Sequence, residues 1–459
     1  MTEEPLPPER RLDQAVQLHQ AGDLSKAEDI YRDVLEADPG NSAALHMLGV
    51  IAFQSGYNDK ALGLIARALR VAPNFPEALN NMGNVFSKMG GLEDALLFFQ
   101  EAVAQKPDYA LAYNHLGSAL LGLGRLDEAA ACHEEAIALN PEFANSHFNL
   151  GRLYLLMGRL EEGWKEYGWR RQVAEFNYAH RPYAQPVWDG GNPDGKNLLL
   201  YPEQGLGDFL QFVRYIPLVA AEGGQIILET PTPMTRLLQG FDGAHTLVQF
   251  GAPLAEFDCH ASLLDLPGIL GTTLETIPAP ANYITSSPEL TDAWAERLGP
   301  REDFRIGLVW AGNPEHTNDA NRSIDPGLLK PLIQIPGISI YNLQVERDGE
   351  AKAVFGDAIT DLAPELKDFS ETAAAIRNLD LVVSVDTSVA HLAGALGHRV
   401  WTLLPFVPDW RWLIDRDDSP WYPSMRLFRQ KTAGDWPGVI KRLAAAIVKQ
   451  ATSKYAPRA

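Results

Sequence analysis

The stretch 110–141 reads ALAYNHLGSALLGLGRLDEAAACHEEAIALNP, and its pattern of small residues, apolar residues and a final proline returns along the first third of the chain. Small Gly and Ala let two helices approach closely, and Pro ends a helix. Three series of residues repeat at a 34-residue interval and predict helix–turn–helix units: Ala27, Ala61, Ala95 and Ala129; Pro39, Pro73, Pro107 and Pro141; and Leu48-Gly49, Met82-Gly83, Leu116-Gly117 and Leu150-Gly151.

These units match the tetratricopeptide pattern. One unit cannot bury its apolar face alone, so we expect about five units, over residues 8–177, to stack into an α-solenoid. Gly163 takes the alanine position of the fifth unit. There Trp164, Tyr167 and Trp169 replace smaller residues, which predicts that this unit forms a seam against the next domain.

The first helices of such units normally line the concave face of the array. Amide groups on that face could hydrogen-bond the backbone of an extended protein segment while tolerating varied side chains. We therefore predict a protein-binding groove; the alternative is an array that packs on its own C-terminal domain or dimerises. The predicted groove residues are Asn80, Asn81, Asn114, His115, His147 and Asn149.

The composition bounds the class of protein. With 459 residues, a formal net charge of −20 and 46% hydrophobic residues, the chain is typical of several folded domains. We see no basic tail, patch or stripe, so no nucleic-acid partner is expected. Two cysteines, Cys132 and Cys259, favour a reducing compartment. No signal peptide or membrane-length apolar run is evident, so we expect a cytoplasmic protein without a membrane span.

Beyond a polar, Pro-rich linker at residues 178–196, short apolar runs alternate with amphipathic segments. This alternation predicts parallel strands with crossover helices. A turn-rich segment, 277–290, suits a connection between two α/β lobes at 197–290 and 300–450. The expected strands are Asn197–Tyr201, Gln225–Leu228, Leu247–Phe250, Phe257–His260, Arg305–Trp310, Ile338–Leu343, Leu381–Val385 and Val400–Leu404.

Ligands of open α/β sheets bind at the carboxyl ends of strands, where three loops carry suitable chemistry. The first is Gln204-Gly205-Leu206-Gly207-Asp208, between strand NLLLY and helix FLQFVRYIPLV. The two glycines permit a tight turn. Asp208 has two readings: an N-cap that satisfies free N–H groups, or a general base acting on an acceptor hydroxyl.

The second loop is Asp386-Thr387-Ser388-Val389-Ala390-His391, between strand LVVSV and helix AHLAGALG. Hydroxyls and free N–H groups at a helix N-terminus suit a phosphate or diphosphate. The alternatives are that Asp386 or Ser388 only caps the helix and that His391 is a core histidine.

The third loop runs from Trp310 through Asn313 to Asn321-Arg322-Ser323. Loops this long and polar are often functional, and Arg322 could clamp a phosphate through its planar guanidinium. The alternative for Arg322 is a surface ion pair.

Other candidates are weaker. Asp415-Arg416-Asp417 has the form of a metal–nucleotide motif, but within DRDDSP a solvated turn is favoured. Four aromatic residues could stack on a base or sugar, although at least half of them should be core: Trp410, Trp412, Trp421 and Tyr422. No hydrolase, zinc or ATPase motif is present.

These segments resemble the heptosyltransferase-like, family nine glycosyltransferases, in the branch linked to tetratricopeptide repeats. The resemblance rests on QGLGDFLQFVRYIP, SLLDLPGILGTTLETIP, GLVWAGNPEHTNDANRSI, DLVVSVDTSVAHLAGALG and WTLLPFVPDWRWLIDRDDSPWYPSMRLFRQ, and covers nearly all of residues 196–445. It implies a GT-B fold of two Rossmann-like lobes, with the acceptor on the first and a nucleotide-sugar on the second. It also implies no cofactor and no required metal.

By position, the resemblance implies that Asp208 is a candidate base and that Asp386, Thr387 and His391 lie at the donor phosphates. Ser388 stands where the family usually has Gly, and Asn321-Arg322-Ser323 replaces a Lys/Arg-Trp-Pro loop. Both departures lie at the donor side and argue against ADP-heptose. The predicted donor residues are Asn313, Arg322, Asp386, Thr387, Ser388 and His391, and the predicted acceptor-side loop is Gln204, Gly205 and Gly207.

The order of repeats followed by this lobe pair is similar to that of bacterial flagellin glycosyltransferases. The resemblance implies transfer of a nonulosonic acid to Ser or Thr of a protein acceptor such as flagellin, held by the repeats. Two alternatives stay open: a heptosyltransferase-like enzyme for a surface polysaccharide, and a non-catalytic scaffold with a degenerate transferase domain.

Overall fold

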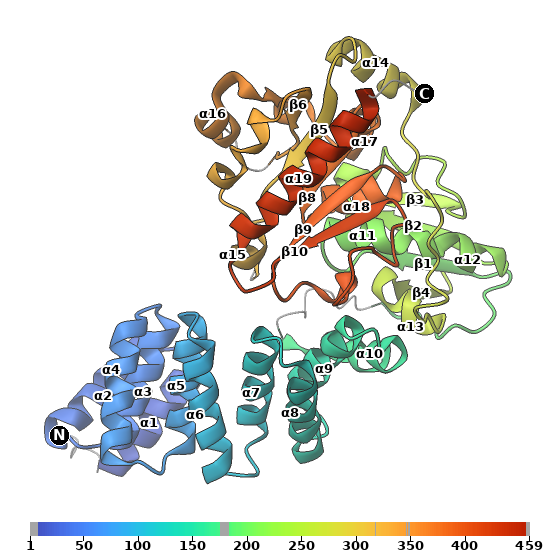
Figure 1. The fold of residues 1–459 in the computed structure, drawn as a ribbon. Coiled ribbons are helices and arrows are strands. Elements are labelled where there is room, and N and C mark those ends of the chain that lie inside the picture. Colours follow the sequence, from blue (N-terminus) through green and yellow to red (C-terminus); the bar gives the residue numbers. More distant parts are fainter. Residues whose placement is uncertain (1–7, 175–182, 317, 346, 348, 456–459) are drawn as a thin grey trace. The chain divides into compact units, whose positions relative to one another are not determined.

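The computed structural model describes residues 8–174, 183–316, 318–345, 347 and 349–455, and the chain divides into two compact units, 1–153 and 154–459. The first unit is a row of antiparallel helix pairs (Figure 1), which confirms the α-solenoid. Its helices are α1 (Pro8–Gln20), α2 (Leu24–Ala37), α3 (Ser42–Gln54), α4 (Asn58–Val71), α5 (Pro76–Lys88), α6 (Leu92–Gln105), α7 (Ala110–Gly122), α8 (Leu126–Leu139) and α9 (Ala144–Leu156), the last of which crosses into the second unit.

Three of the repeated glycines, Gly49, Gly83 and Gly117, lie as expected where two helices touch. A Cβ atom at Gly83 would lie 2.5 Å from the Phe99 ring, and one at Gly117 would lie 2.8 Å from His133. A further 34-residue series, not noticed in the sequence, occupies the turns inside the units with positive φ, which glycine adopts without strain. Its members are Gly22, Gly56, Gly90, Gly124 and Gly158.

The second unit begins with the end of α9 and contains two parallel sheets. The first sheet has the order β3-β2-β1-β4 and the second β10-β9-β8-β5-β6-β7, which is the Rossmann order for six strands. The strands are β1 (Asn197–Tyr201), β2 (Gln225–Thr230), β3 (Thr246–Gln249), β4 (Cys259–Ser262), β5 (Phe304–Val309), β6 (Ile338–Asn342), β7 (Thr360–Asp361), β8 (Leu381–Val385), β9 (Val400–Leu404) and β10 (Met425–Arg429).

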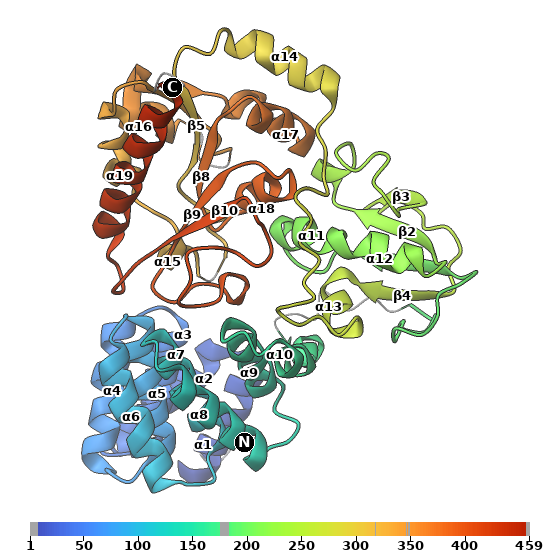
Figure 2. The same cartoon turned by 45° about the vertical axis from the view of Figure 1, so that its right-hand side comes forward.

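Helices cover both faces of the second sheet. Figure 2 shows α17 (Phe369–Arg377) and α18 (Ser388–Ala395) on one side, with α16 (Glu350–Phe355) and α19 (Trp436–Tyr455) on the other. The apolar side of α19 shares one buried core with β5, β8 and β9, so the last helix is integral to this lobe. Among the described residues, no helix is both long and apolar enough to cross a bilayer.

The predicted strands are all present, with bounds that differ by up to two residues; among interior strands β5 is shifted by one residue and β2 ends two residues later than predicted. β1, β8 and β9 begin and end as expected, whereas β3 is shifted by one residue and β4 by two. Strands β7 and β10 were not predicted. Both are edge strands, and β10 carries Arg426 and Arg429, so its apolar pattern is weak.

The fifth repeat packs on the α/β region, as its large aromatic residues predicted. In α10 (Leu160–Tyr167), the indole N–H of Trp164 donates to the Thr272 carbonyl at 2.9 Å, and its ring lies edge-on to Trp410 at 5.3 Å. In the turn that follows, Arg170 is fully buried and pairs with Glu203 at the end of β1. This helix therefore belongs to the second compact unit, although its sequence belongs to the repeats.

Candidate functional site

The loops after β1 and β8 meet. Each follows the strand at which the connections of its sheet change direction, the place where open α/β sheets bind ligands. The helices that follow, α11 (Leu206–Phe212) and α18, pack against each other. A Cβ atom at Gly207 would lie 2.9 Å from His391 Cδ2, so this position tolerates only glycine at the observed approach. The first two predicted loops thus form one cluster.

Asp208 is the third residue of α11 and Gly205 is the N-cap, so Asp208 is not itself the N-cap residue, although its carboxylate accepts an N–H at the helix start. The Gly205 N–H donates to Asp208 Oδ2 at 2.8 Å, while Asp208 Oδ1 accepts a hydrogen bond from the Arg411 guanidinium. Burial raises the pKa of Asp208, and Arg411 opposes that shift. The side chain retains 16% exposure.

Arg411 is the site residue that the sequence analysis missed. It lies in the segment after β9 and is buried. It also binds Asp409 at 2.7 Å and lies 4.3 Å from the centre of the Trp410 ring. Its Nε atom has no hydrogen-bond partner within the described residues. The sequence feature that could have indicated Arg411 is its position between Trp410 and Trp412, but only the two aromatic rings were considered as candidates.

The segment that carries Arg411 is strained. Leu413 and Asp415 both have positive φ, which non-glycine residues rarely adopt. The guanidinium of Arg429 holds this backbone by donating to the carbonyls of Trp412, Leu413 and Arg416. Strain held by surrounding contacts is typical of functional segments.

At the second loop, Thr387 is the N-cap of α18, but its side chain caps no helical N–H; its hydroxyl lies 2.9 Å from that of Ser384. Ser388 is the first residue of the helix and is half-buried. The turn thus places two hydroxyl side chains at the start of α18.

His391 is buried, with its Nδ1 atom 2.8 Å from the Tyr422 hydroxyl and its Nε2 atom 3.9 Å from Asp386 Oδ1. Burial, with Arg411 as the next contributor, lowers the pKa of His391 to about 3, so the imidazole is neutral at physiological pH. Burial and the charge of Asp409 raise the pKa of Asp386 to about 6. His391 is therefore a neutral imidazole beside the Asp386 carboxyl group, whose pKa is about 6.

Arg322 of the third loop joins the cluster. It ends the short helix α15 (Asp319–Arg322), donates to the Asp386 carbonyl at 3.1 Å and binds Asp319 at 3.3 Å. Its guanidinium lies against Gly312, where a Cβ atom would clash with it. Asn313 is exposed, and its side chain accepts the Glu315 N–H at 2.9 Å, so it shapes the loop. Arg322 thus forms an ion pair with Asp319 and also contacts the loop that begins at Asp386.

Gln204, in the loop after β1, adds a hydrogen-bond donor to this cluster. Its side-chain nitrogen is buried and has no hydrogen-bond partner in the described ranges. Gly205 is exposed beside it. A buried amide N–H without a partner is costly and is usually satisfied by water or a ligand.

The predicted groove residues of the repeat array bond mainly to neighbouring repeats. Asn80 Oδ1 lies 2.8 Å from His115 Nδ1, and Asn114 Oδ1 accepts from Ser146 and Asn149. Asn81 lies 2.7 Å from His46, and His147 lies 2.9 Å from the carbonyl of Pro141. Asn80, Asn114 and His147 are buried, whereas Asn81, His115 and Asn149 are half-buried and still reach the surface.

The weaker candidates are structural. The aromatic residues considered for stacking on a base are all buried, and Arg416 forms a bidentate pair with Asp418 in the exposed 415–418 turn. Those aromatic residues are Trp410, Trp412, Trp421 and Tyr422. Within the described residues no group of three or more His, Cys, Asp or Glu is arranged to hold a metal ion.

The chain carries tetratricopeptide repeats and a glycosyltransferase family 9 domain. Residues 18–82, 80–132 and 119–158 match models of tetratricopeptide repeats, and residues 342–406 match the model described as glycosyltransferase family 9 (heptosyltransferase). The last match includes the turn from Asp386 to His391 and ends before Arg411.

A relative is the protein FlbA of Caulobacter vibrioides, 28% identical over 317 residues, which cover 62% of this chain and 52% of FlbA. The match thus spans about half of FlbA. Solved repeat structures are also similar. MamA is 25% identical over 36% of this chain and 97% of its own (TM-score 0.31), and TTC0263 of Thermus thermophilus is 24% identical over 38% and 94% (TM-score 0.33). TM-scores of this size support no functional conclusion.

Proposed function

We propose that the chain is a GT-B glycosyltransferase that moves a sugar from a nucleotide-sugar to a hydroxyl of a protein acceptor. Asp208 takes the proton of the acceptor hydroxyl, whose oxygen attacks the anomeric carbon while the bond from that carbon to the phosphate oxygen breaks. The charge that grows on the leaving phosphate is stabilised by N–H groups at the start of α18, by Thr387 and Ser388, and by Arg322.

The observation that carries this proposal is the meeting of the Asp208 loop with the Thr387 turn. Base and phosphate site must both lie next to the anomeric carbon, and the contact between Gly207 and His391 brings their loops together. Two buried donors there, Gln204 Nε2 and Arg411 Nε, have no partner in the described part of the chain, and an anionic or hydroxylated ligand would satisfy both.

Arg411 has to release Asp208 for the base to work. An ion-paired carboxylate is a poor proton acceptor, whereas a buried one without its cation is a better base, because burial favours its protonated form. A bound donor offers Arg411 a phosphate in exchange for Asp208. We therefore propose that donor binding frees the base.

For the finer assignment we propose a nonulosonic acid as the sugar, flagellin as the acceptor, the repeat array as its holder, and a cytoplasmic, metal-independent reaction. The support is the exchange of the heptosyltransferase loop for Asn321-Arg322-Ser323 and the presence of protein-binding repeats beside the family 9 domain. Undiminished transfer in excess EDTA would support metal independence.

The test is transfer from a CMP-nonulosonate to flagellin, followed by intact mass. Asp208→Asn keeps the shape and removes the base, so we expect kcat to fall by about 10²- to 10⁴-fold with nucleotide binding retained in a thermal-shift assay. The control is Asp357→Asn, whose side chain is 96% exposed and away from the site. Wild-type turnover by Asp208→Asn would remove Asp208 from the role of base.

Two other functions have an observation in their favour. The family model is described as a heptosyltransferase, which predicts turnover with ADP-heptose and a lipid-A-type acceptor. The Arg411–Asp208 pair suits a scaffold that has lost catalysis, which predicts that no nucleotide raises the melting temperature. A genuine donor site would add about 2.7 kcal/mol of stability at a hundredfold excess over Kd.

A further inference from the structure

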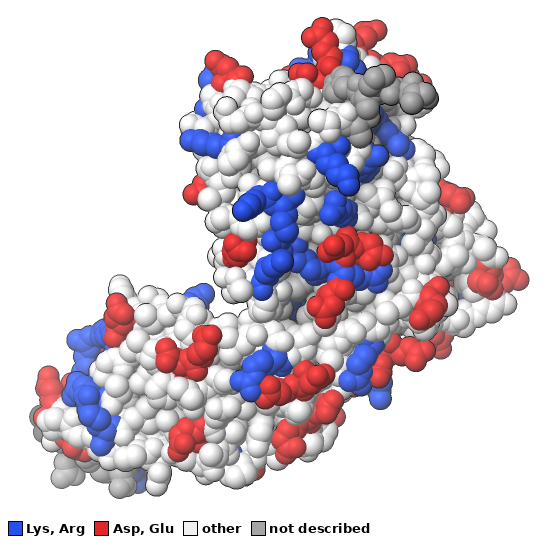
Figure 3. Space-filling model, viewed as in Figure 1, with Lys and Arg blue, Asp and Glu red and all other residues white. Residues whose placement is uncertain are grey.

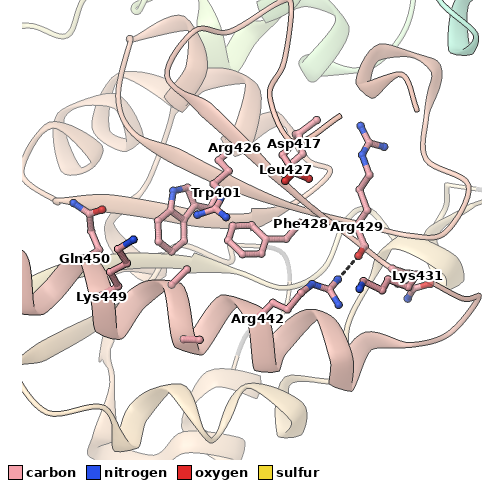
Figure 4. Close-up of a pocket in the computed structure, with 13 residues that line it drawn as sticks. Trp401, Asp417, Arg426, Leu427, Phe428, Arg429, Lys431, Arg442, Lys449 and Gln450 are labelled. Atoms are coloured by element: carbon pink, nitrogen blue, oxygen red, sulfur yellow. Dashed lines mark hydrogen bonds between the residues drawn. The ribbon is translucent and has the colours of Figure 1, made fainter. Parts of the chain in front are cut away.

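A groove of about 810 Å³ lies between the edge strand β10 and helix α19, outside the cluster described above (Figure 4). Its floor contains the buried rings of Trp401 and Phe428 and two alanines of α19, and its rim carries long basic side chains. The lining residues are Trp401, Asp417, Arg426, Leu427, Phe428, Arg429, Gln430, Lys431, Arg442, Ala445, Ala446, Lys449 and Gln450.

The charge of this region opposes that of the chain. The last 35 residues contain eight Lys or Arg and one acidic residue, Asp435, although the whole chain has a net charge of −20. Figure 3 shows Lys and Arg side chains gathered on the face over α19 and β10. The expectation that the chain has no basic patch is therefore wrong for this face, because a net charge averages over distant segments.

Four cations of the groove form no ion pair within the described residues, although Asp417 also lines it and its charge acts on Arg429. Arg426 lies over the Phe428 ring, 4.7 Å from its centre, and Arg442 donates to the Arg429 carbonyl. Within the described residues, neither these two arginines nor Lys431 and Lys449 form an ion pair. Like charges gathered with few counter-charges repel one another, and a bound anion would relieve that repulsion.

Size and shape select the kind of anion. A cavity of this volume is in the range of small-molecule sites, whereas a membrane surface would require a flat or convex basic face. Exposed Asp415, Asp417 and Asp418 at one end would repel a long polyanion that continued past the groove. Arg442 and Lys449 are seven residues apart on α19, about 10 Å along the helix, so a ligand that contacts both carries several anionic groups.

We propose that this groove is a second anion site, separate from the Thr387 turn, that binds a small ligand with several phosphate groups. Arg442 and Lys431 hold one end of the ligand, Lys449 and Arg426 hold the other, and the alanine surface of α19 lets it lie close to the helix. Free oligophosphate and a nucleoside triphosphate share this chemistry, and the two differ in whether a base adds affinity.

The experiment is calorimetric titration of the full chain with tripolyphosphate and, separately, with ATP. We expect the double variant Arg442→Gln/Lys449→Gln to weaken tripolyphosphate binding at least tenfold. The matched control is Lys441→Gln/Lys352→Gln, which removes the same number of charges outside the groove. Lys441 directly precedes Arg442 on α19, and Lys352 is an exposed residue of α16. Equal weakening in both double variants would reduce the effect to net charge and overturn the proposal.

Further arms separate this groove from the Thr387 cluster and from a surface that binds any polyanion. Arg322→Gln removes a cation from the Thr387 cluster, so it should weaken only binding at that cluster and leave the binding that Arg442→Gln/Lys449→Gln removes. Loss of that same binding in Arg322→Gln would place the ligand at the Thr387 cluster and overturn the proposal. Wild-type protein that fails to bind tripolyphosphate but binds poly-glutamate or phosphatidylglycerol vesicles would also overturn the proposal. Tighter binding of ATP than of tripolyphosphate would support the nucleotide, and equal binding the oligophosphate.

Discussion

The repeat array and the α/β unit use polar side chains in opposite ways. In the array, Asn80, Asn114 and Asn81 bond to residues about one repeat away, so the polar groups tie one repeat to the next. In the α/β unit, Asp208, Arg411 and Arg322 come from separate loops and converge where strands end. Polar residues that recur with the 34-residue repeat hold the repeats together, whereas polar residues from the loops of the α/β unit gather at the candidate site.

A substitution at Arg170 tests whether the fifth repeat belongs to the repeat array or to the α/β unit. By sequence it belongs to the fifth repeat, yet its guanidinium is buried against Glu203, at 2.6 Å, and Asp265, at 2.8 Å. Arg170→Met leaves the buried Glu203 carboxylate without its cation and leaves Asp265 with Arg171 alone, so we expect a loss of about 3–5 kcal/mol. Hydrogen exchange should show faster opening of peptides in 197–455 but not in 24–139.

The control for Arg170 is Arg159→Gln on the same repeat, because the Arg159–Glu162 pair is exposed at both ends. Such pairs contribute about 0–1 kcal/mol. Adding Glu203→Gln to Arg170→Met should restore part of the stability. If Arg170→Met instead loosened the repeats and left the sheets protected, the fifth repeat would have to be grouped with the array.

Asn114 tests whether the amides of the array are structural. It is buried and accepts two hydrogen bonds from the next repeat, from the Ser146 hydroxyl and the Asn149 amide, both at 3.1 Å. Asn114→Ala leaves those donors unsatisfied, so we expect a loss of about 1–3 kcal/mol, measured by urea unfolding. The control is Ser118→Ala on the same helix, since Ser118 is exposed and bonds only within its own turn.

The same variants sharpen the comparison in binding. A purely structural Asn114 should change stability far more than affinity for an acceptor protein, whereas the half-buried Asn149 should show the reverse balance. Unchanged stability with lost affinity in Asn114→Ala would make Asn114 a ligand contact.

The sequence was sufficient for the architecture because its signals are periodic or local. The 34-residue series predicted the helix pairs, and the runs NLLLY and LVVSV predicted β1 and β8 to the residue. The edge strand β10 was missed because two of its five residues are arginines, which weakens its apolar pattern. The cluster of Asp208 with the Thr387 turn was foreseen only in outline, since strand ends meet through topology rather than through spacing.

Arg411 and the basic groove could not be predicted from the residues alone. Arg411 becomes significant when the segment after β9 folds back to Asp208, 203 positions earlier in the chain. The groove exists because α19 lies beside β10, which brings Lys431 and Lys449 to one rim. Charges that pair or gather through tertiary contacts leave no periodic signal.

The smallest expected effect concerns pH and distinguishes the α/β site from ordinary structure. Because the pKa of Asp386 is raised to about 6, the folded protein retains a proton that the unfolded chain releases near pH 4. The contribution of this group to stability is therefore greatest in acid, falls as pH rises from about 4 to about 6, and stays constant above that range. His391, with its pKa lowered to about 3, remains neutral throughout this interval.

Asp386→Asn removes the titrating group and keeps the side-chain volume. We expect its Tm to exceed that of the wild type by a few degrees at pH 8 and to equal it at pH 4. The control is Asp357→Asn, which should shift Tm equally little at both pH values because Asp357 is exposed. A variant that is less stable than the wild type at pH 8 would mean that the Asp386 carboxylate is held by favourable contacts with Arg322 and Arg411. The turn would then already be electrostatically satisfied, and a donor phosphate would have to displace one of those contacts in order to bind.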